Sequence, residues 1–548
     1  MAHALAGKPV QEQDIIDVQT IVDAYFDNVP DMTNPTQLVS FGTSGHRGTS
    51  VDGTFTDLHV AAITQAICDG RKQFGATGPI FVGQDTHALS QPALVTVLEV
   101  LAGNGVTAMV DCDMAFVPTP SVSRAIIRYN EEHDDKADGI IITPSHNPPD
   151  NGGIKYNTII GGPADTVVTK WIEMRANEYL TAYCESEDFK RISIDNIEPS
   201  AQVPYDYKGL YVEELGDVIN MEAIKAAGPK VLVDTLGGSG ASYWNAIKER
   251  YGLDLTIIHD DYDPTFSFMT YDHDGKVRMD CSSTYVMASV INRIGDFDLA
   301  VGNDPDYDRY GIVVSSGLIS ANTFLTLAAR YLFTTRGWKH KGVGKTVVCT
   351  TMIDKWAADA EIPVYEVPVG FKYFSQLLFD GAIGIGGEES AGASFLKKDG
   401  TVWTTDKDGM IMALLSMEIM AVMGKSALKM ADEFVEEFGN PSFGRIDAPC
   451  KKEQKQILKQ MSAELITATT VDGDPITNIR TTSLYNDMPI DGVRVETDKG
   501  WFVARPSGTE DLYKIYGESY KGDLGLVALL TVGEEIVNAA LNGTIETE

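Results

Sequence analysis

The sequence predicts an α/β protein made of several domains in series, with mixed or mainly parallel sheets and a smaller α+β domain at the end. The chain has 548 residues, which at about 150 residues per domain corresponds to three or four domains. Short apolar segments alternate with helix-like stretches through most of the sequence, as in α/β units. After residues 436–445 a charged helix and turn-rich short strands follow, which indicates a different kind of domain.

Six short apolar segments are expected to contain strands, and each ends in a loop rich in glycine, aspartate, serine or threonine. They are residues 79–85, 137–143, 230–240, 298–304, 345–351 and 382–390. Helical patterns separate them, which is typical of strands covered by helices on both faces of a sheet. Ligands of such sheets bind beyond the carboxyl ends of the strands, so these loops are where we expect the chemistry.

Four domains are expected, at residues 1–205, 206–325, 326–445 and 446–548. Residues 197–209 are predicted to be a linker, and the second break falls near an expected helix at 321–333. The last domain is expected to begin with a charged helix at 451–461 and to end with another helix. Three successive α/β units of similar size are compatible with an internal repeat.

The charge of the chain limits its partners. Lys plus Arg number 44 and Asp plus Glu number 78, so the formal net charge is −34. This excess of negative charge repels nucleic acids and anionic membranes at long range, and neither is expected as a partner. An anionic substrate would therefore need a local basic site within an acidic protein.

Cysteine spacing and hydropathy indicate a soluble, cytoplasmic protein. No CxxC pair occurs, which is typical of reduced thiols; the six cysteines are Cys68, Cys112, Cys184, Cys281, Cys349 and Cys450. The first fourteen residues lack the apolar core of a signal peptide. The most apolar stretch, near the C-terminus, is interrupted by Gly533, Glu534 and Glu535, so no membrane span is expected.

Ser145 follows an expected strand in the loop Thr143-Pro144-Ser145-His146-Asn147. A serine on such a loop with a histidine beside it is exposed for nucleophilic chemistry. No GxSxG motif surrounds it, so acyl transfer is not supported. The alternative interpretation is an ordinary proline-containing turn.

Three aspartates, Asp304, Asp306 and Asp308, alternate in a short segment directly after the apolar run DLAV. At a spacing of two, their side chains lie on one side of an extended segment and can converge on a hard cation such as Mg²⁺. The alternative is a solvated acidic turn. Three like charges repel unless a cation or an arginine compensates them, and Arg309 follows directly.

Three more loops have the residue types that bind sugars or phosphates. Glu388 and Ser390, after two glycines, offer carboxylate and hydroxyl partners for sugar hydroxyls. Arg505 begins RPSGTE, where a guanidinium precedes small hydroxyl residues that can hold a phosphate. The segment FGTSGHRG at 41–48 has similar chemistry. Each of these loops could alternatively be a structural turn.

Together these motifs resemble the α-D-phosphohexomutase superfamily, in particular its bacterial-type, glucose-specific phosphoglucomutases. The motifs that carry the resemblance are, in order, FGTSGHRG, TPSHNPPDNGGIKYN, GNDPDYDRYG, GEESAG and RPSGTE. They span every domain that we expect. The resemblance implies three similar α/β domains and a smaller fourth around one central cleft.

The resemblance also implies roles for individual residues. The implied Mg²⁺ ligands are an oxygen of phosphorylated Ser145 with Asp304, Asp306 and Asp308. The implied catalytic residues are Ser145, His146, Arg47, Lys155 and Lys407. The implied substrate-binding residues are Gly370, Glu388, Ser390, Arg309, Arg505, Ser507, Gly508 and Thr509, of which Glu388 and Ser390 would bind the sugar.

The chain departs from the family pattern at two places. Some members that also accept mannose have a histidine just after the sugar-loop serine, whereas Ala391 and Gly392 follow Ser390 here. The general base therefore stays unassigned. Val369, before Gly370, replaces a threonine that is frequent in glucose-type members, which removes one hydrogen bond.

The implied activity is the interconversion of α-D-glucose 1-phosphate and glucose 6-phosphate, through a phosphoserine enzyme and glucose 1,6-bisphosphate. Mg²⁺ would be the cofactor, a hexose phosphate the partner, and the enzyme a monomer or homodimer. Two alternatives stay open: a metal-dependent sugar phosphatase that uses the same serine, and a non-catalytic sugar-phosphate-binding protein.

Overall fold

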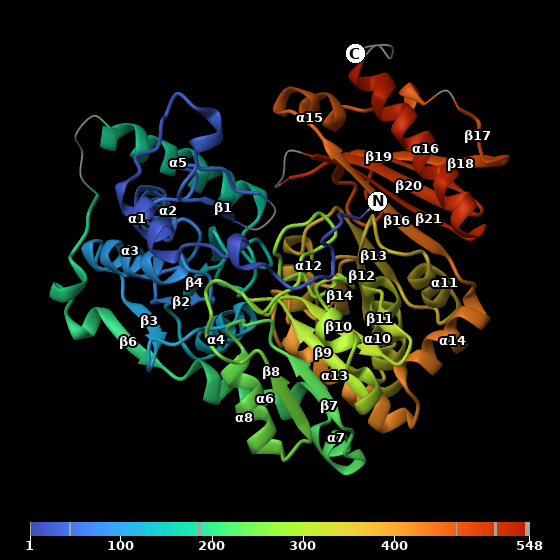
Figure 1. Cartoon of the computed structure of the whole chain (residues 1–548), viewed down its shortest axis with the longest axis horizontal. Helices are drawn as coiled ribbons and strands as arrows, with labels where there is room; N and C mark the ends of the chain where they lie inside the picture. Colours follow the sequence, from blue (N-terminus) through green and yellow to red (C-terminus); the bar gives the residue numbers. More distant parts are fainter. Residues whose placement is uncertain (1, 43–44, 185–188, 467, 509–511, 543–548) are drawn as a thin grey trace.

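The computed structural model in Figure 1 contains four β-sheets that follow one another along the chain. It describes residues 2–42, 45–184, 189–466, 468–508 and 512–542. Helices surround the first three sheets, and the last sheet has its helices on one side (Figure 1). The predicted fold class, three α/β domains and a smaller C-terminal α+β domain, is thereby confirmed.

The first domain has a mixed sheet of order β1-β5-β4-β2-β3-β6. Its strands are β1 (His46–Thr49), β2 (Ile80–Gln84), β3 (Ala108–Asp111), β4 (Asp138–Ile142), β5 (Asn151–Asn157) and β6 (Gln202–Tyr205). Its helices are α1 (Val18–Asp27), α2 (Asp57–Gly70), α3 (Ser90–Gly103), α4 (Thr119–Glu132) and α5 (Thr166–Cys184). Strands β2 and β4 are completely buried, which explains their continuous apolar sequences.

Part of the expected linker at 197–209 is wrong, because β6 lies within it and pairs in parallel with β3. The sequence QVPY has no buried residue and contains Pro204, which removes a ladder donor. A proline is tolerated at the edge of a sheet, where β6 lies, but such a strand has no clear apolar pattern.

The second domain has a five-stranded sheet of order β11-β10-β9-β7-β8. Its strands are β7 (Val231–Asp234), β8 (Leu255–Ile258), β9 (Leu299–Asn303), β10 (Tyr310–Val314) and β11 (Gly317–Ile319). Its helices are α6 (Tyr207–Val218), α7 (Met221–Ala227), α8 (Ala241–Tyr251) and α9 (Ala288–Ile291). Strands β9 and β10 are antiparallel, so the aspartate segment between them forms the connection of a hairpin.

The third domain has a four-stranded sheet of order β13-β12-β14-β15. Its strands are β12 (Gly342–Thr346), β13 (Val364–Val367), β14 (Ile383–Gly387) and β15 (Ala393–Phe395). Its helices are α10 (Ala321–Arg336), α11 (Met352–Asp359), α12 (Lys372–Phe379), α13 (Gly409–Met423) and α14 (Ala427–Phe438). Helix α13 contacts α7, β9 and β10 of the second domain, so the two domains share one hydrophobic core.

The strand expected at 345–351 is shifted, because β12 starts at Gly342 and ends at Thr346. Val347 and Val348 lie in a turn after the strand and are buried against residues of the fourth domain, among them Trp501. Their apolar character therefore comes from contact between domains and not from sheet pairing.

The fourth domain has an antiparallel sheet of order β16-β21-β20-β19-β18-β17. Its strands are β16 (Ser442–Pro449), β17 (Thr470–Val471), β18 (Asp474–Thr482), β19 (Pro489–Thr497), β20 (Gly500–Pro506) and β21 (Leu512–Ser519). Its helices are α15 (Lys452–Lys459) and α16 (Gly522–Leu541). Helix α16 is long and apolar enough to cross a membrane, and in this structure one of its faces packs against β20 and β21.

The three domain boundaries stay predictions. The boundary at 205/206 falls between β6 and α6, whereas 325/326 falls inside α10 and 445/446 inside β16. The five cysteines whose side chains are described are free, as the sequence predicts.

Candidate active site

Ser145 lies in the loop between β4 and β5 and is 1 % exposed. Its φ of +60° is unusual for a residue other than glycine, and such backbone strain occurs preferentially at functional sites. The backbone N–H of Ser145 donates to the hydroxyl of Thr143 at 2.7 Å. Its own hydroxyl donates to Oδ2 of Asp304 at 2.8 Å, which places the serine of the first domain against the acidic loop of the second.

The three aspartates of the β9–β10 connection converge, as the spacing predicts. Asp304, Asp306 and Asp308 are all completely buried, and one carboxylate oxygen of each lies within 4.8 Å of the others. Burial and the two neighbouring carboxylates raise the pKa of Asp304 well above its ordinary value. Burial acts in the same direction on Asp308, but Lys155 and Lys407 outweigh it and lower that pKa. The charges of the loop are therefore compensated unequally: the two lysines favour the ionised form of Asp308, whereas the neighbouring carboxylates disfavour the ionised form of Asp304.

The aspartate loop fits a divalent cation. Oδ1 of Asp306 and Oδ1 of Asp308 are buried and have no hydrogen-bond partner among the described residues. An unpaired buried carboxylate oxygen is costly, and oxygen atoms of this kind are the ligands that Mg²⁺ prefers. These orphaned atoms, together with Asp304, are the donor set that the sequence predicts for the metal.

Two lysines from different domains contact the same carboxylates. Nζ of Lys155, on β5, lies 2.6 Å from Oδ2 of Asp306 and 3.1 Å from Oδ2 of Asp308. Nζ of Lys407, in the loop before α13, lies 2.8 Å from Oδ2 of Asp308. Burial opposes the charge of Lys155, but the two aspartates outweigh burial and raise its pKa. Two cations of this acidic protein are therefore held beside the aspartate loop.

Arg309, His146 and Arg47 surround this cluster. The backbone N–H of Arg309 donates to Asp304 at 2.9 Å, and its Nε lies 3.8 Å from Asp308. Nδ1 of His146 lies 3.5 Å from the hydroxyl of Ser145. Burial and then the charge of Arg309 lower the pKa of His146. Arg47 is on β1, which pairs with the strand that contains Lys155.

The predicted sugar loop is joined to the aspartate loop. Gly392 pairs with Arg309 in an isolated β-bridge, and the N–H of Tyr310 donates to the carbonyl of Ala391 at 3.1 Å. Burial raises the pKa of Glu388 to about 7, although Lys407 opposes the rise. Ser390 is half-buried in the same loop. Both protonation states of Glu388 are therefore populated near neutral pH.

The predicted phosphate loop lies on the fourth domain, apart from the serine and the aspartates. Arg505 is at the end of β20, and no hydrogen bond or ion pair within the described part of the chain links it to the aspartate loop. Its Nε is buried with no hydrogen-bond partner among described residues. Ser507 is buried and Gly508 exposed, and Thr509 lies outside the described residues.

Gly370 belongs to the third domain. It occupies the loop between β13 and α12 with a φ of +131°, which only glycine adopts readily. Burial raises the pKa of Tyr373, on α12, and the charge of Arg505 opposes this rise. The predicted sugar loop thus lies with the cluster around Ser145, whereas no hydrogen bond or ion pair among the described residues joins Arg505 or Gly370 to that cluster.

Several residues at the site were not predicted from the sequence. Asp85 accepts hydrogen bonds from Thr143 at 2.6 Å and from His87 at 2.9 Å, behind the serine loop. Asp280 lies 3.8 Å from Arg309. Asp85 ends an expected strand, as the predicted loop residues do, but a single aspartate there is common. Asp280 has no local signal of this kind.

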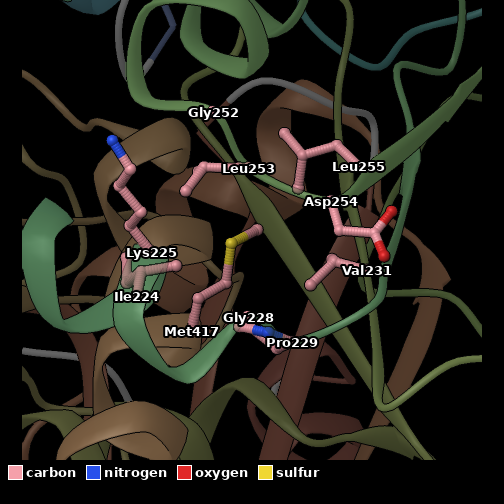
Figure 2. Close-up of a pocket in the computed structure, with 10 residues that line it drawn as sticks. All are labelled: Ile224, Lys225, Gly228, Pro229, Val231, Gly252, Leu253, Asp254, Leu255 and Met417. Atoms are coloured by element: carbon pink, nitrogen blue, oxygen red, sulfur yellow. The ribbon is translucent and has the colours of Figure 1, made fainter.

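A small apolar pocket lies elsewhere in the second domain (Figure 2). It is lined at the start of β7 and β8 by Val231 and Leu255, so it is at the opposite end of the sheet from the loop that follows β9. In Figure 2 the thioether of Met417 points into the pocket, whereas the charged ends of Lys225 and Asp254 point away from its centre. This pocket offers no site for a charged substrate.

The fold and the cluster around Ser145 define a class of protein: metal-dependent enzymes that transfer phosphoryl groups. The family can be named from four matches along the chain. Phosphoglucomutase/phosphomannomutase alpha/beta/alpha domains I, II and III match residues 38–182, 210–317 and 320–438, and the C-terminal domain of that family matches residues 447–524. The chain belongs to this family, within the α-D-phosphohexomutase superfamily, and is an enzyme of the isomerase class.

Individual relatives agree with this assignment. A protein of Komagataeibacter xylinus named phosphoglucomutase is 46 % identical over 539 residues, which cover 97 % of each chain. Phosphoglucomutase 1 of Saccharomyces cerevisiae is 27 % identical over 88 % of each chain. The resemblance to bacterial-type phosphoglucomutases is thereby confirmed.

Solved structures share the fold at lower identity. The open form of parafusin, a phosphoglucomutase from Paramecium, superposes with a TM-score of 0.72 at 20 % identity, covering 94 % of this chain and 96 % of that chain. A putative phosphomannomutase from Thermus thermophilus gives a TM-score of 0.71 at 23 % identity, covering 91 % and 99 %. The four-domain arrangement is therefore common to the wider family.

Proposed function

We propose that this protein interconverts α-D-glucose 1-phosphate and glucose 6-phosphate through a phosphate group carried on Ser145. The observation that supports this most directly is the hydrogen bond from the Ser145 hydroxyl to Asp304, within a buried group of three carboxylates and two lysines. The relative at 46 % identity, whose name is phosphoglucomutase, supports glucose as the sugar.

Ser145, once phosphorylated, donates its phosphoryl group to the free hydroxyl of the sugar phosphate. The bond between phosphorus and Oγ breaks as a bond to the sugar oxygen forms, and the proton of that hydroxyl passes to a general base. The product is glucose 1,6-bisphosphate, which turns round and returns its other phosphate to Ser145. Phosphoryl transfer of this kind depends mainly on alignment and charge neutralisation.

Residues around Ser145 would supply this neutralisation. Asp304, Asp306 and Asp308 would hold Mg²⁺ with a phosphoserine oxygen, and the ion when bound acts as a Lewis acid on phosphoryl oxygens. Lys155 and Arg309, each within 4 Å of these carboxylates, would stabilise charge on the phosphoryl group. Arg47, His146 and Lys407 are assigned to proton transfer and substrate contact at the same centre.

The remaining predicted residues would hold the rest of the substrate. Glu388 and Ser390 would accept and donate hydrogen bonds to the sugar, with Gly370 leaving room for it. Arg505, Ser507, Gly508 and Thr509 would hold the phosphate that is not being transferred. The bisphosphate must present each of its two phosphates to Ser145 in turn. A single site around Arg505 that accepts either phosphate would hold the one that is not reacting.

The test is to incubate the enzyme with glucose 1-phosphate, Mg²⁺ and a trace of glucose 1,6-bisphosphate, and to follow the products by phosphorus NMR. We expect glucose 6-phosphate as the main product. Mainly free phosphate would replace the proposal by the phosphatase alternative. No turnover, with sugar phosphate nevertheless bound, would favour the non-catalytic binding protein.

Glu388 makes the proposed reaction sensitive to pH. Its pKa of about 7 means that it gains a proton as the pH falls, and a protonated carboxyl is a poorer acceptor for sugar hydroxyls. We therefore expect kcat/KM to fall on the acid side of a midpoint near 7. Glu388→Gln should have lower activity and lack this acid limb.

The comparison of wild type with Glu388→Gln isolates the ionisation of Glu388, because the substrate phosphate ionises identically in both assays. An acid limb of the same midpoint and depth in Glu388→Gln would contradict the assignment.

A further inference from the structure

Helix α4 of the first domain contacts both of the other domains that contribute to the Ser145 cluster. In Figure 1 it lies where the first domain meets the second. Arg124 and Arg128 on this helix bind Glu214 on α6, at 2.7 and 2.6 Å. The hydroxyl of Ser123 accepts hydrogen bonds from the backbone N–H groups of Thr405 and Asp406, directly before Lys407.

The first residue of this helix, Thr119, reaches the aspartate loop. Thr119 is completely buried. Its backbone N–H donates to the carbonyl of Asp306 at 2.9 Å, and its hydroxyl donates to Oδ2 of the same residue at 2.7 Å. One residue of the first domain thus holds both the backbone and the carboxylate of Asp306 in the second domain, the carbonyl through its own backbone N–H and the carboxylate through its hydroxyl.

The two oxygens of the Asp306 carboxylate consequently have different surroundings. Oδ2 accepts hydrogen bonds from Thr119 and from Lys155, whereas Oδ1 is buried and has no partner among the described residues. A carboxylate with one oxygen held by two donors cannot rotate without losing both bonds. Its other oxygen is therefore fixed in direction before any ion arrives.

We infer that Thr119 is a positioning residue for the metal: it orients Asp306 so that Oδ1 faces the cation. This inference rests on the proposed function, in which the three aspartates bind Mg²⁺. Outer-shell hydrogen bonds to metal-binding carboxylates fix their orientation, and their loss typically costs 10- to 100-fold in metal affinity. Thr119 acts through Asp306 and does not touch the substrate or the ion itself.

The test measures Mn²⁺ binding to the full-length enzyme by titration calorimetry, without substrate. Thr119→Val keeps the shape of the side chain and removes its hydroxyl, and we expect it to weaken Mn²⁺ binding by about tenfold. Thr119→Ser retains the hydroxyl and should bind within about twofold of the wild type. Ser121→Ala is the matched control on the same helix, because Ser121 is buried like Thr119 but no hydrogen bond among the described residues joins its hydroxyl to the aspartate loop.

A second readout separates positioning from general damage to the fold. If Thr119 acts on metal affinity, the Mg²⁺ concentration for half-maximal rate should rise in Thr119→Val, while kcat at saturating Mg²⁺ returns close to that of the wild type. Circular dichroism and thermal melting establish that each variant is folded. Should Thr119→Val not fold, Thr119→Ala removes the same hydroxyl and takes its place.

Asp306→Asn distinguishes the failure of this inference from that of the proposed function. Wild-type binding of Mn²⁺ that is lost in Asp306→Asn but unchanged in Thr119→Val would overturn the role of Thr119 alone. Binding that is absent from the wild type, or unchanged in Asp306→Asn, would overturn the metal site on which both depend.

Discussion

Replacement of Ser145 by alanine is expected to lower kcat for glucose 1-phosphate by roughly 10⁴-fold or more, the scale on which loss of a nucleophile acts. The hydroxyl is the only part of the side chain that the substitution removes. Alanine keeps the Cβ atom at the strained φ of +60°, so the loop loses a nucleophile and a hydrogen bond to Asp304 but no backbone constraint. A large fall in kcat would therefore reflect the loss of the nucleophile and not a change in the backbone of the loop.

Intact-mass spectrometry and peptide mapping provide the direct measurement. The wild-type enzyme, after exposure to glucose 1,6-bisphosphate, should contain one phosphate on the peptide with Ser145, and Ser145→Ala should contain none. Ser315→Ala, at an exposed turn after β10, is the control and should match the wild type in mass and rate. A Ser145→Ala enzyme with wild-type turnover would rule out this serine as the phosphate carrier.

Removal of divalent cations with EDTA should lower turnover by about 10³-fold or more, since a Lewis acid on a phosphoryl group contributes several kcal/mol. The physical reason is the charge of the aspartate loop. Burial and the two neighbouring carboxylates raise the pKa of Asp304, and a bound cation would relieve this repulsion. Addition of Mg²⁺ should restore the rate.

A second acidic group provides the control for this experiment. Asp272, His273 and Asp274 also lie close enough together to share an ion, but only Asp272 is buried. His273→Ala should leave the Mg²⁺ dependence unchanged, whereas Asp306→Asn should abolish it. Full turnover of the wild type in metal-free buffer would contradict the assignment of the metal to the β9–β10 loop. A Mg²⁺ dependence that is lost in His273→Ala would contradict it as well.

The sequence was sufficient for the features that arise locally. Strands such as β2 and β4 are buried on both faces, so their apolar runs are unambiguous. Asp304, Asp306 and Asp308 follow such a run at the spacing of an extended segment, and the structure brings them together as that spacing predicts. The strand–loop boundaries also placed Ser145 correctly at the carboxyl end of a buried strand.

Features that depend on contact between domains have no local signal in the sequence, and the pairing of Ser145 with the aspartates was implied only by the family resemblance. Thr119 and Asp306 are far apart in the sequence, and nothing near Thr119 signals a hydrogen bond to a metal loop. Val347 and Val348 looked like strand residues because contact with the fourth domain requires the same apolar side chains as a sheet. Strand β6 was missed for the opposite reason: it is an edge strand that contains a proline and lacks the apolar pattern typical of a strand.

The ion pairs that cross from one domain to another have a consequence for the chain while it is being synthesised. Domains generally fold in order as they leave the ribosome. The serine and the carboxylates emerge before Lys407, which must still arrive to neutralise Asp308. A nascent chain that ends before Lys407 has only one of the two lysines, Lys155, against Asp308. We therefore expect limited proteolysis of ribosome-bound intermediates to find the acidic hairpin more accessible than in the finished enzyme.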